Sequence, residues 1–131
     1  MIARSGRAVL AYDVIGEPRA DAEPVLLVHA GVTDRRSWGP LTDRLALTRQ
    51  VIRFDMRGFG ETTYEPEPWS RVDDAVAVLD AAGAARAAVV GASMGGSAAI
   101  DLTLAHPDRV ERLVLIAPAV SGAPDVFDDT E

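Results

Sequence analysis

The stretch VVGASMGGSA, residues 89–98, decides how the rest of this sequence is interpreted. A short apolar run enters a turn of glycine and serine, and a segment of small residues leaves it. Gly91, Ser93 and Gly95 form the pattern G-x-S-x-G, in which a serine lies on a sharp turn between a strand and a helix. The residues two positions to either side must be small, because a larger side chain would collide with the backbone of the turn. The pattern predicts that Ser93 has a strained backbone and an exposed hydroxyl, as a nucleophile requires.

A tight turn without a chemical role is the alternative for Ser93, and the surrounding residues favour the nucleophile. Residues 86–93 are typical of a buried strand and residues 95–107 of a helix, which is the context that the motif needs. A phosphate-binding loop would need Lys and then Ser or Thr after the glycines, where the chain has Ser97 and Ala98. A dinucleotide-binding fingerprint would need a glycine in place of Ser93 and a carboxylate at the end of the next strand, and the sequence offers neither.

Apolar runs and helical stretches extend this unit in both directions. Four short apolar runs predict buried strands at residues 24–31, 51–55, 86–93 and 111–119. An imperfectly alternating stretch predicts another strand at residues 7–17. Three further stretches predict helices at residues 38–48, 70–83 and 95–107. Because strands alternate with helices, we expect an α/β fold in one domain, residues 1–131, with a mostly parallel sheet and helices on both faces.

Two of the predicted helices carry more detailed signals. The first is expected to have one apolar face, made of Trp38, Leu41, Leu45 and Leu47. In the second, Ser70 and Asp73 resemble a capping box with Asp in place of the usual Glu or Gln, and Gly83 ends the helix.

Three polar residues come at the carboxyl ends of predicted strands, where chemistry collects in sheets of this kind. They are His29, Asp55 and Ser93. We therefore expect the functional site at that edge of the sheet.

Composition excludes several kinds of chemistry. The chain has 131 residues, of which 48% are hydrophobic and 25% charged, as is ordinary for a globular domain. It has no cysteine, which excludes disulfides, thiolate zinc sites and cysteine nucleophiles. It has no lysine either, which excludes Schiff-base chemistry and a phosphate-loop lysine. We expect a protein without a cofactor or a metal.

Charge and hydropathy bear on partners and location. The net charge of −7 argues against binding to nucleic acid. Four acidic residues near the end of the sequence are expected to be solvated: Asp125, Asp128, Asp129 and Glu131. The sequence has no run of about 18 apolar residues that could span a membrane, and its N-terminus lacks the apolar stretch of a secretory signal. We expect no membrane partner and a cytoplasmic location.

Three stretches, in this order, resemble motifs of the α/β-hydrolase fold family. Residues 26–38, LLVHAGVTDRRSW, resemble its histidine-glycine oxyanion loop. Residues 54–62, FDMRGFGET, resemble its Asp-x-Arg-Gly-x-Gly loop. Residues 89–119 resemble its nucleophile elbow, the helix after it and the next strand. The resemblance implies an incomplete α/β-hydrolase fold of the serine-nucleophile branch, corresponding to the N-terminal half only.

This resemblance implies a role for each matched residue. Ser93 matches the nucleophile, and the backbone N–H groups of Met94 and Gly31 match the oxyanion donors, with Val32 as the alternative to Gly31. His29 matches a residue that shapes the oxyanion loop, and its use as a substitute base is the alternative. A structural loop beside the site is matched by Asp55, Arg57, Gly58 and Gly60.

The sequence also departs from the family's pattern. Ala30 stands where a glycine usually follows the loop histidine, and Ala92 stands where a histidine often precedes the nucleophile. A serine at position 93 in place of an aspartate argues against the haloalkane dehalogenases and epoxide hydrolases of this family.

The general base is the residue that the sequence does not supply. The family's chain order is nucleophile, acid, histidine, and the one histidine after Ser93 is His106. His106 falls near the far end of the predicted helix, about 20 Å from Ser93 at about 1.5 Å per residue. We expect the acid beyond Glu131, with Asp125, Asp128 or Asp129 as the alternative. The strand at residues 111–119 is then expected to be an apolar sheet edge that a second chain could cover.

We expect a hydrolase of small carboxylic esters or lactones, in which Ser93 attacks the acyl carbon. A C–C bond hydrolase, a thioesterase and a cofactor-free haloperoxidase are alternatives within the same fold. A non-catalytic half-domain that binds a partner chain or a small apolar ligand is the alternative outside catalysis. The expected partner is a small ester-like molecule.

Overall fold

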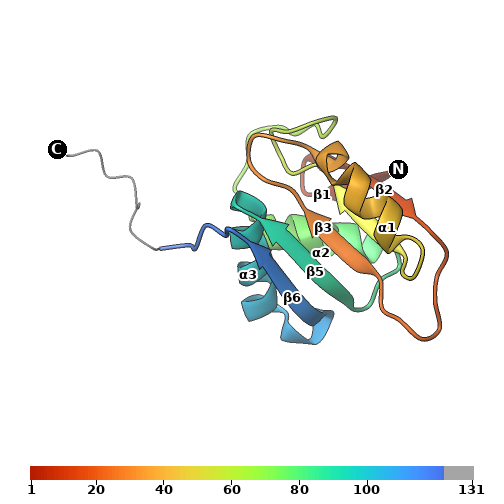
Figure 1. Cartoon of the computed structure of the whole chain (residues 1–131). Helices are drawn as coiled ribbons and strands as arrows, with labels where there is room; N and C mark the ends of the chain where they lie inside the picture. Colours follow the sequence, from red (N-terminus) through yellow and green to blue (C-terminus); the bar gives the residue numbers. More distant parts are fainter. Residues whose placement is uncertain (123–131) are drawn as a thin grey trace.

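The strands form one sheet in the order β1-β2-β4-β3-β5-β6 in the computed structural model, which describes residues 1–122 (Figure 1). The strands are β1 (Ile2–Ser5), β2 (Ala8–Ile15), β3 (Val25–Val28), β4 (Val51–Phe54), β5 (Ala87–Ala92) and β6 (Val110–Ile116). The helices are α1 (Gly39–Leu45), α2 (Arg71–Ala81) and α3 (Met94–Ala105), with short 3-10 helices η1 (Arg35–Trp38) and η2 (Pro107–Arg109). β3, β4, β5 and β6 are parallel, whereas the hairpin of β1 and β2 joins β4 antiparallel. The predicted α/β fold with a mostly parallel sheet is confirmed.

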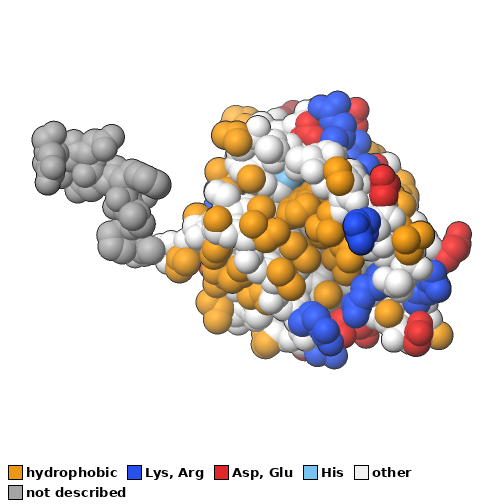
Figure 2. Space-filling view, viewed as in Figure 1, with side chains coloured by type: hydrophobic (Ala, Val, Ile, Leu, Met, Phe, Trp, Pro, Cys, Tyr) orange, Lys and Arg blue, Asp and Glu red, His pale blue; other side chains and the backbone are white. Residues whose placement is uncertain are grey.

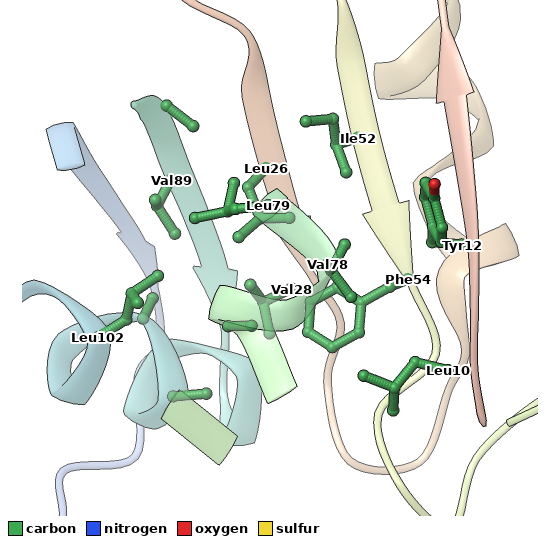
Figure 3. Packing of buried hydrophobic residues seen from close by; sticks show 14 of the residues in the cluster. Leu10, Tyr12, Leu26, Val28, Ile52, Phe54, Val78, Leu79, Val89 and Leu102 are labelled. Carbon is green, nitrogen blue, oxygen red and sulfur yellow. The ribbon is translucent and has the colours of Figure 1, made fainter. Parts of the chain in front are cut away.

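Different helices cover the two faces of the sheet. On one face, α2 and α3 pack over Leu26, Val28 and Val89 (Figure 3). On the other face, α1 packs over Leu27 and Val51. Because successive residues of a strand point to opposite faces, the central strand β3 is buried on both sides and is apolar throughout. The predicted helices on both faces are confirmed.

Local signals set the bounds of α2. Ser70 is its N-cap residue, and Ser70 Oγ accepts a hydrogen bond from the Asp73 N–H at 3.0 Å. Gly83 follows the helix with a φ of 72°, a conformation that glycine adopts at little cost. Ser70 as the cap and Gly83 as the stop of this helix are thus confirmed, whereas of the predicted capping box only the bond to the Ser70 side chain is seen within residues 1–122.

The hairpin at the N-terminus was only half predicted. The sequence predicts a single strand at residues 7–17, whereas the structure has β1 and β2 joined by a turn that contains Gly6 with a φ of 54°. β1 has four residues, of which Ala3 alone is buried. A strand this short shows too little alternation to be seen in the sequence.

The first predicted helix is shorter than its apolar pattern. The expected helix at residues 38–48 is α1 only as far as Leu45. Beyond it the N–H groups of Leu47 and Thr48 bond to carbonyls three residues back, at 3.4 and 3.0 Å, in place of the four-residue spacing of an α-helix. Leu47 lies past the end of α1 and is 75% exposed, so its predicted place on the buried face is wrong.

No helix within the described residues is long and apolar enough to cross a membrane.

β6 lies at the edge of the sheet and exposes apolar side chains. Val114 and Ile116 are 49% and 48% exposed and are in register with Val90 and Ala92 of β5. They lie on the face that α1 covers, but α1 does not extend over β6 (Figure 1). Figure 2 shows apolar side chains gathered over this part of the molecule. Within residues 1–122 no strand pairs with the outer side of β6, as the sequence predicts.

Candidate active site

Ser93 lies on the turn between β5 and α3, at the carboxyl end of the parallel strands. Its φ of 51° and ψ of −114° form a backbone conformation that residues with a side chain rarely adopt. Ser93 is an exposed residue, and its side chain makes no capping hydrogen bond to α3. The predicted strained and exposed turn is confirmed.

Backbone crowding explains why the residues on either side of Ser93 are glycine. A Cβ on Gly95 would overlap the carbonyl oxygens of Val28 and His29, and a Cβ on Gly91 would overlap the carbonyl of Gly95. These are backbone atoms, which cannot move aside as the end of a flexible side chain can. The first turn of α3 therefore lies directly against the end of β3.

The loop after β3 reaches the start of α3, so Gly31 and Met94 are neighbours. A Cβ on Gly31 would lie 2.7 Å from Met94 Cε and 3.4 Å from Met94 Cβ. The loop is closed by the Ala30 carbonyl, which accepts hydrogen bonds from Thr33 N–H at 3.1 Å and Thr33 Oγ1 at 2.8 Å. Val32, the alternative donor, is 95% exposed at the tip of this loop.

Both predicted oxyanion donors have an N–H group without a backbone partner in the described part of the chain. Met94 is the first residue of α3, so its N–H has no helical carbonyl to bind. Gly31 N–H donates no backbone hydrogen bond within residues 1–122. The N-terminus of α3 adds positive potential at the same place. This arrangement can receive an oxygen that gains negative charge.

His29 is fully buried, and both of its ring nitrogens are occupied. Nε2 accepts a hydrogen bond from Met56 N–H at 3.0 Å, so Nδ1 carries the proton and donates to the Ala30 carbonyl at 2.7 Å. The ring also packs edge-on against Phe59 with 5.2 Å between centroids. Burial lowers the pKa of His29 below 6.5, although the Ala30 carbonyl and Asp55 oppose the shift. With no nitrogen left for a proton from Ser93, the geometry favours the loop role of His29 over the substitute base.

Asp55 is fully buried at the end of β4 and joins two loops. Oδ1 accepts from Arg35 N–H in the loop after β3, and Oδ2 accepts from Glu61 N–H in the next loop, both at 2.8 Å. The Arg35 guanidinium also pairs with the Asp55 carboxylate and reaches Asp13 Oδ2 at 3.0 Å. Gly60 has a φ of 53°, and a Cβ there would overlap the Asp55 carboxylate. These contacts make Asp55 a structural residue beside the site.

Arg35 is a part of this network that the sequence analysis does not single out. Its guanidinium lies among the carboxylates of Asp13, Asp55 and Glu61, and its side chain is 13% exposed. Burial lowers the pKa of Arg35, but hydrogen bonds to Glu61 and Asp13 and the charge of Asp55 raise it overall. An arginine in a polar loop carries no local sequence signal of such contacts, because its partners come from three separate segments.

Arg57 fixes the same glycine loop to α2. Its Nε and Nη2 bind the two oxygens of Asp74 at 2.9 and 3.0 Å, and its Nη1 binds Glu67 Oε1 at 2.7 Å. Its guanidinium carbon lies 4.9 Å from the ring centre of Trp69. The hydrogen bond to Asp74 is the main cause that raises the pKa of Arg57. Gly58, with a φ of 89°, lets the chain turn directly after it. This loop has the structural role that the resemblance implies.

Neither of the chain's two histidines is placed to take a proton from Ser93. His106 is the C-cap residue of α3 and lies at the opposite end of that 12-residue helix. The helix alone spans about 18 Å at about 1.5 Å per residue. The candidate acids Asp125, Asp128 and Asp129 lie outside the described residues.

A polar hollow of about 350 Å³ lies at the other end of the strands. Charged residues of both signs line it: Arg19, Asp21, Glu23, Arg49, Arg86 and Glu111. Arg86 and Glu111 lie at the starts of β5 and β6, whereas Ser93 follows the end of β5. The hollow is therefore not part of the candidate site.

Comparison with known proteins identifies the family to which the chain belongs. A sequence profile described as the alpha/beta hydrolase fold matches residues 23–131, which is most of the chain. The chain belongs to the alpha/beta hydrolase fold family. The resemblance of the three motifs is thereby confirmed at the level of the family.

Individual proteins that this chain is similar to are named hydrolases or a lactonase. The chain is 41% identical over 105 residues to a 2-hydroxymuconate semialdehyde hydrolase from Pseudomonas sp. (strain CF600), covering 73% of the chain and 36% of the relative. The crystal structure of an enol-lactonase from Burkholderia xenovorans LB400 matches with a TM-score of 0.79 and 30% identity, over 86% of this chain and 45% of that one. The crystal structure of a hydrolase from Pseudomonas aeruginosa PA01 matches with a TM-score of 0.80 and 31% identity, over 91% and 46%. The chain spans less than half the length of each of these proteins.

Proposed function

We propose that this chain carries the nucleophile and the oxyanion loop of a serine hydrolase that acts on small carboxylic esters or lactones. One observation carries the proposal: Ser93 is an exposed residue with a φ of 51°, at the end of β5 and the start of α3. Glycines that tolerate no side chain flank it, and the Gly31 loop lies against Met94 beside it. Backbone strain of this kind collects at active sites, where it holds a reactive group in place.

The proposed chemistry uses groups of the described residues in two steps. Ser93 Oγ attacks the acyl carbon, and the former carbonyl oxygen becomes an oxyanion that takes hydrogen bonds from the N–H groups of Gly31 and Met94. Removing one such donor typically slows a reaction about 100- to 1000-fold. The tetrahedral intermediate then expels the alcohol, which takes up the proton that Ser93 gave to the base, and leaves the acyl group on Ser93. Water then attacks this ester, which releases the carboxylic acid and restores the Ser93 hydroxyl.

The base in this scheme comes from outside these residues. His29 has both nitrogens occupied, and His106 lies at the far end of α3. We therefore assign the proton of Ser93 to a histidine that is not among the two of this chain. An acid role for Asp125, Asp128 or Asp129 stays a prediction. Without the base, Ser93 would keep only the part of catalysis that comes from the oxyanion donors and substrate binding.

The names of relatives guide the choice of substrates. One relative is named an enol-lactonase, which supports a lactone. Another is named a 2-hydroxymuconate semialdehyde hydrolase, so 2-hydroxymuconate semialdehyde is the compound with which to test the C–C hydrolase alternative.

The cytoplasmic location also stays a prediction.

The experiment is labelling with a fluorophosphonate probe in the presence of increasing imidazole, which serves as a diffusible base. We expect the label on Ser93, located by mass spectrometry, at a rate that rises with the imidazole concentration. Ser93→Ala should take no label, and Ser5→Ala, in β1, is the control that keeps it. A protein that takes no label on Ser93 at any imidazole concentration would contradict the proposal.

A non-catalytic half-domain is the second candidate, and the exposed apolar edge of β6 favours it. Val114, Leu115 and Ile116 are 49%, 36% and 48% exposed on that strand. Such a protein would bind a partner chain or a small apolar ligand and would not react through Ser93. The imidazole titration separates the two candidates, since only the hydrolase gives a label on Ser93.

A further inference from the structure

Two neighbouring strands are each followed by a residue with a positive φ, and the proposed function uses only one of these residues. Within residues 1–122, two residues other than glycine have a positive φ, namely Ser93 at 51° and Ala117 at 43°. Ala92 of β5 pairs with Ile116 of β6, so Ser93 and Ala117 are each the next residue along. A positive φ at an alanine is strained and persists only where surrounding contacts fix it. The contacts around Ala117 therefore need an explanation of their own.

The backbone on either side of Ala117 binds both polar backbone groups of Ser93. Ser93 N–H donates to the Ile116 carbonyl at 3.0 Å, and the Ser93 carbonyl accepts from Ala119 N–H at 3.0 Å in addition to the helical bond from Ser97 N–H at 3.1 Å. Because the chain turns at Ala117, Ile116 before the turn can accept a hydrogen bond from Ser93, and Ala119 after the turn can donate one to it. The strained residue after β6 thus allows two hydrogen bonds to hold the strained residue after β5.

Side chains attach this segment to α3. Ser121 Oγ donates to Asp101 Oδ2 at 2.9 Å, so the proton in the 2.9 Å contact between Ser97 Oγ and Ser121 Oγ comes from Ser97. Hydrogen bonds in such a chain strengthen one another. Pro118 packs against α3 as well, since a Cβ on Gly96 would lie 2.7 Å from Pro118 Cβ. The segment is fixed at both its start and its end.

We propose that residues 117–121 are a positioning clamp for Ser93 and that Ser121 is the residue that anchors the clamp. The inference rests on the proposed function, because that function gives the position of Ser93 its purpose. If the clamp opens, the Ser93 backbone loses the Ala119 hydrogen bond and relaxes from its strained conformation. The Ser93 hydroxyl then moves relative to the N–H groups of Gly31 and Met94. Ser121 acts through the backbone and touches no substrate, so it is a positioning residue.

The experiment is amide hydrogen exchange of the whole chain, compared between the native protein and Ser121→Ala. Losing the anchor should raise exchange of the Ser93 and Ala119 N–H groups about 5- to 10-fold, the usual effect of removing one hydrogen bond on a local opening. Ser121→Thr keeps the hydroxyl and should restore native exchange. The N–H groups of Val9 and Tyr12, hydrogen-bonded in the distant hairpin, should not change.

Three outcomes decide the inference. Faster exchange confined to Ser93 and Ala119, also produced by Asp101→Ala, supports the clamp. Unchanged exchange at these two N–H groups overturns it, and so does an equal rise at Val9 and Tyr12, which would show a general loss of stability.

Fluorophosphonate labelling with imidazole keeps this inference separate from the proposed function. If Ser93 is labelled, Ser121→Ala should slow the labelling several-fold and Ser121→Thr should not. If the native protein takes no label, the proposed function fails while the exchange measurement still tests the clamp. If labelling proceeds at the native rate in Ser121→Ala, the clamp has no role in positioning and the inference is wrong.

Discussion

The loops after β4 and β5 end at the same edge of the sheet and are built in opposite ways. After β4, Asp55 and Arg57 are buried, and backbone groups and counter-charges bind them on several sides. After β5, Ser93 is exposed and strained, and its side chain makes no capping hydrogen bond. Buried polar residues with several partners each hold the site's loops in place, whereas the candidate nucleophile is held by its backbone and its side chain does not cap α3.

Removing Asp55 should have the largest effect, because it leaves Arg35 and two loop N–H groups without their buried partner. We expect Asp55→Ala to lower the free energy of unfolding by about 3–5 kcal/mol, as when one member of a buried pair is removed. Urea denaturation measures this difference. Glu61→Gln is the control at the same arginine, because the Glu61 side chain is 76% exposed and should contribute at most about 1 kcal/mol. Equal effects of the two variants would show that the buried network does not stabilise the loops.

A side chain on Gly95 should have the next largest effect. Gly95→Ala places a Cβ against the carbonyl oxygens of Val28 and His29, which separates α3 from β3. We expect a loss of about 2–3 kcal/mol of unfolding free energy, measured by thermal denaturation. Gly39→Ala is the matched control in α1, where a Cβ meets nothing within 4 Å and the φ is −47°. A similar loss in both variants would mean that the close approach at Gly95 is not the cause.

Acid should destabilise the protein through His29. The pKa of His29 is lowered in the folded state from 6.5, so below that pH the unfolded chain binds a proton that the folded chain does not. Stability should therefore fall as the pH drops from 6.5 toward the folded pKa, with a slope of at most about 1.4 kcal/mol per pH unit. His29→Gln should remove this part of the pH dependence, as followed by urea denaturation at several pH values. An unchanged slope would show that His29 is not held neutral.

Replacing Ser93 by glycine should have the smallest effect, and its sign should be reversed. Ser93→Gly relieves the strain of a φ of 51° and should stabilise the protein by about 1 kcal/mol. Ser93→Ala keeps the Cβ and should leave the urea midpoint near that of the native protein. The same result for both variants would show that the turn stores no strain.

The parallel part of the fold could be predicted because its strands are short apolar runs and its turns contain glycine. The turn at Ser93 could be predicted from the sequence for the same reason, since Gly91 and Gly95 stand where the backbone leaves no room for a side chain. The prediction for Leu47 failed because an apolar residue at helical spacing does not indicate where the helix ends.

Contacts between separate segments could not be predicted. Arg35 donates a hydrogen bond to Asp55, which lies 20 residues later in the sequence. Ser121 donates one to Asp101, which lies 20 residues earlier. Arginine, serine and aspartate are common in polar loops, so their types at these positions predict no particular partner. Such pairs become visible only when the fold brings the segments together.

Within residues 1–122, β6 has one hydrogen-bonded neighbour, β5, and Ser93 follows directly on the end of β5. The outer edge of β6 and the nucleophile are thus separated by the width of one strand, and the clamp connects them. Linkage follows from this arrangement: a polypeptide that binds the edge more tightly when the clamp is closed must favour the closed clamp by the same factor. For such a polypeptide, binding at the sheet edge and the conformation of Ser93 are two coupled equilibria, and each shifts the other by the same free energy.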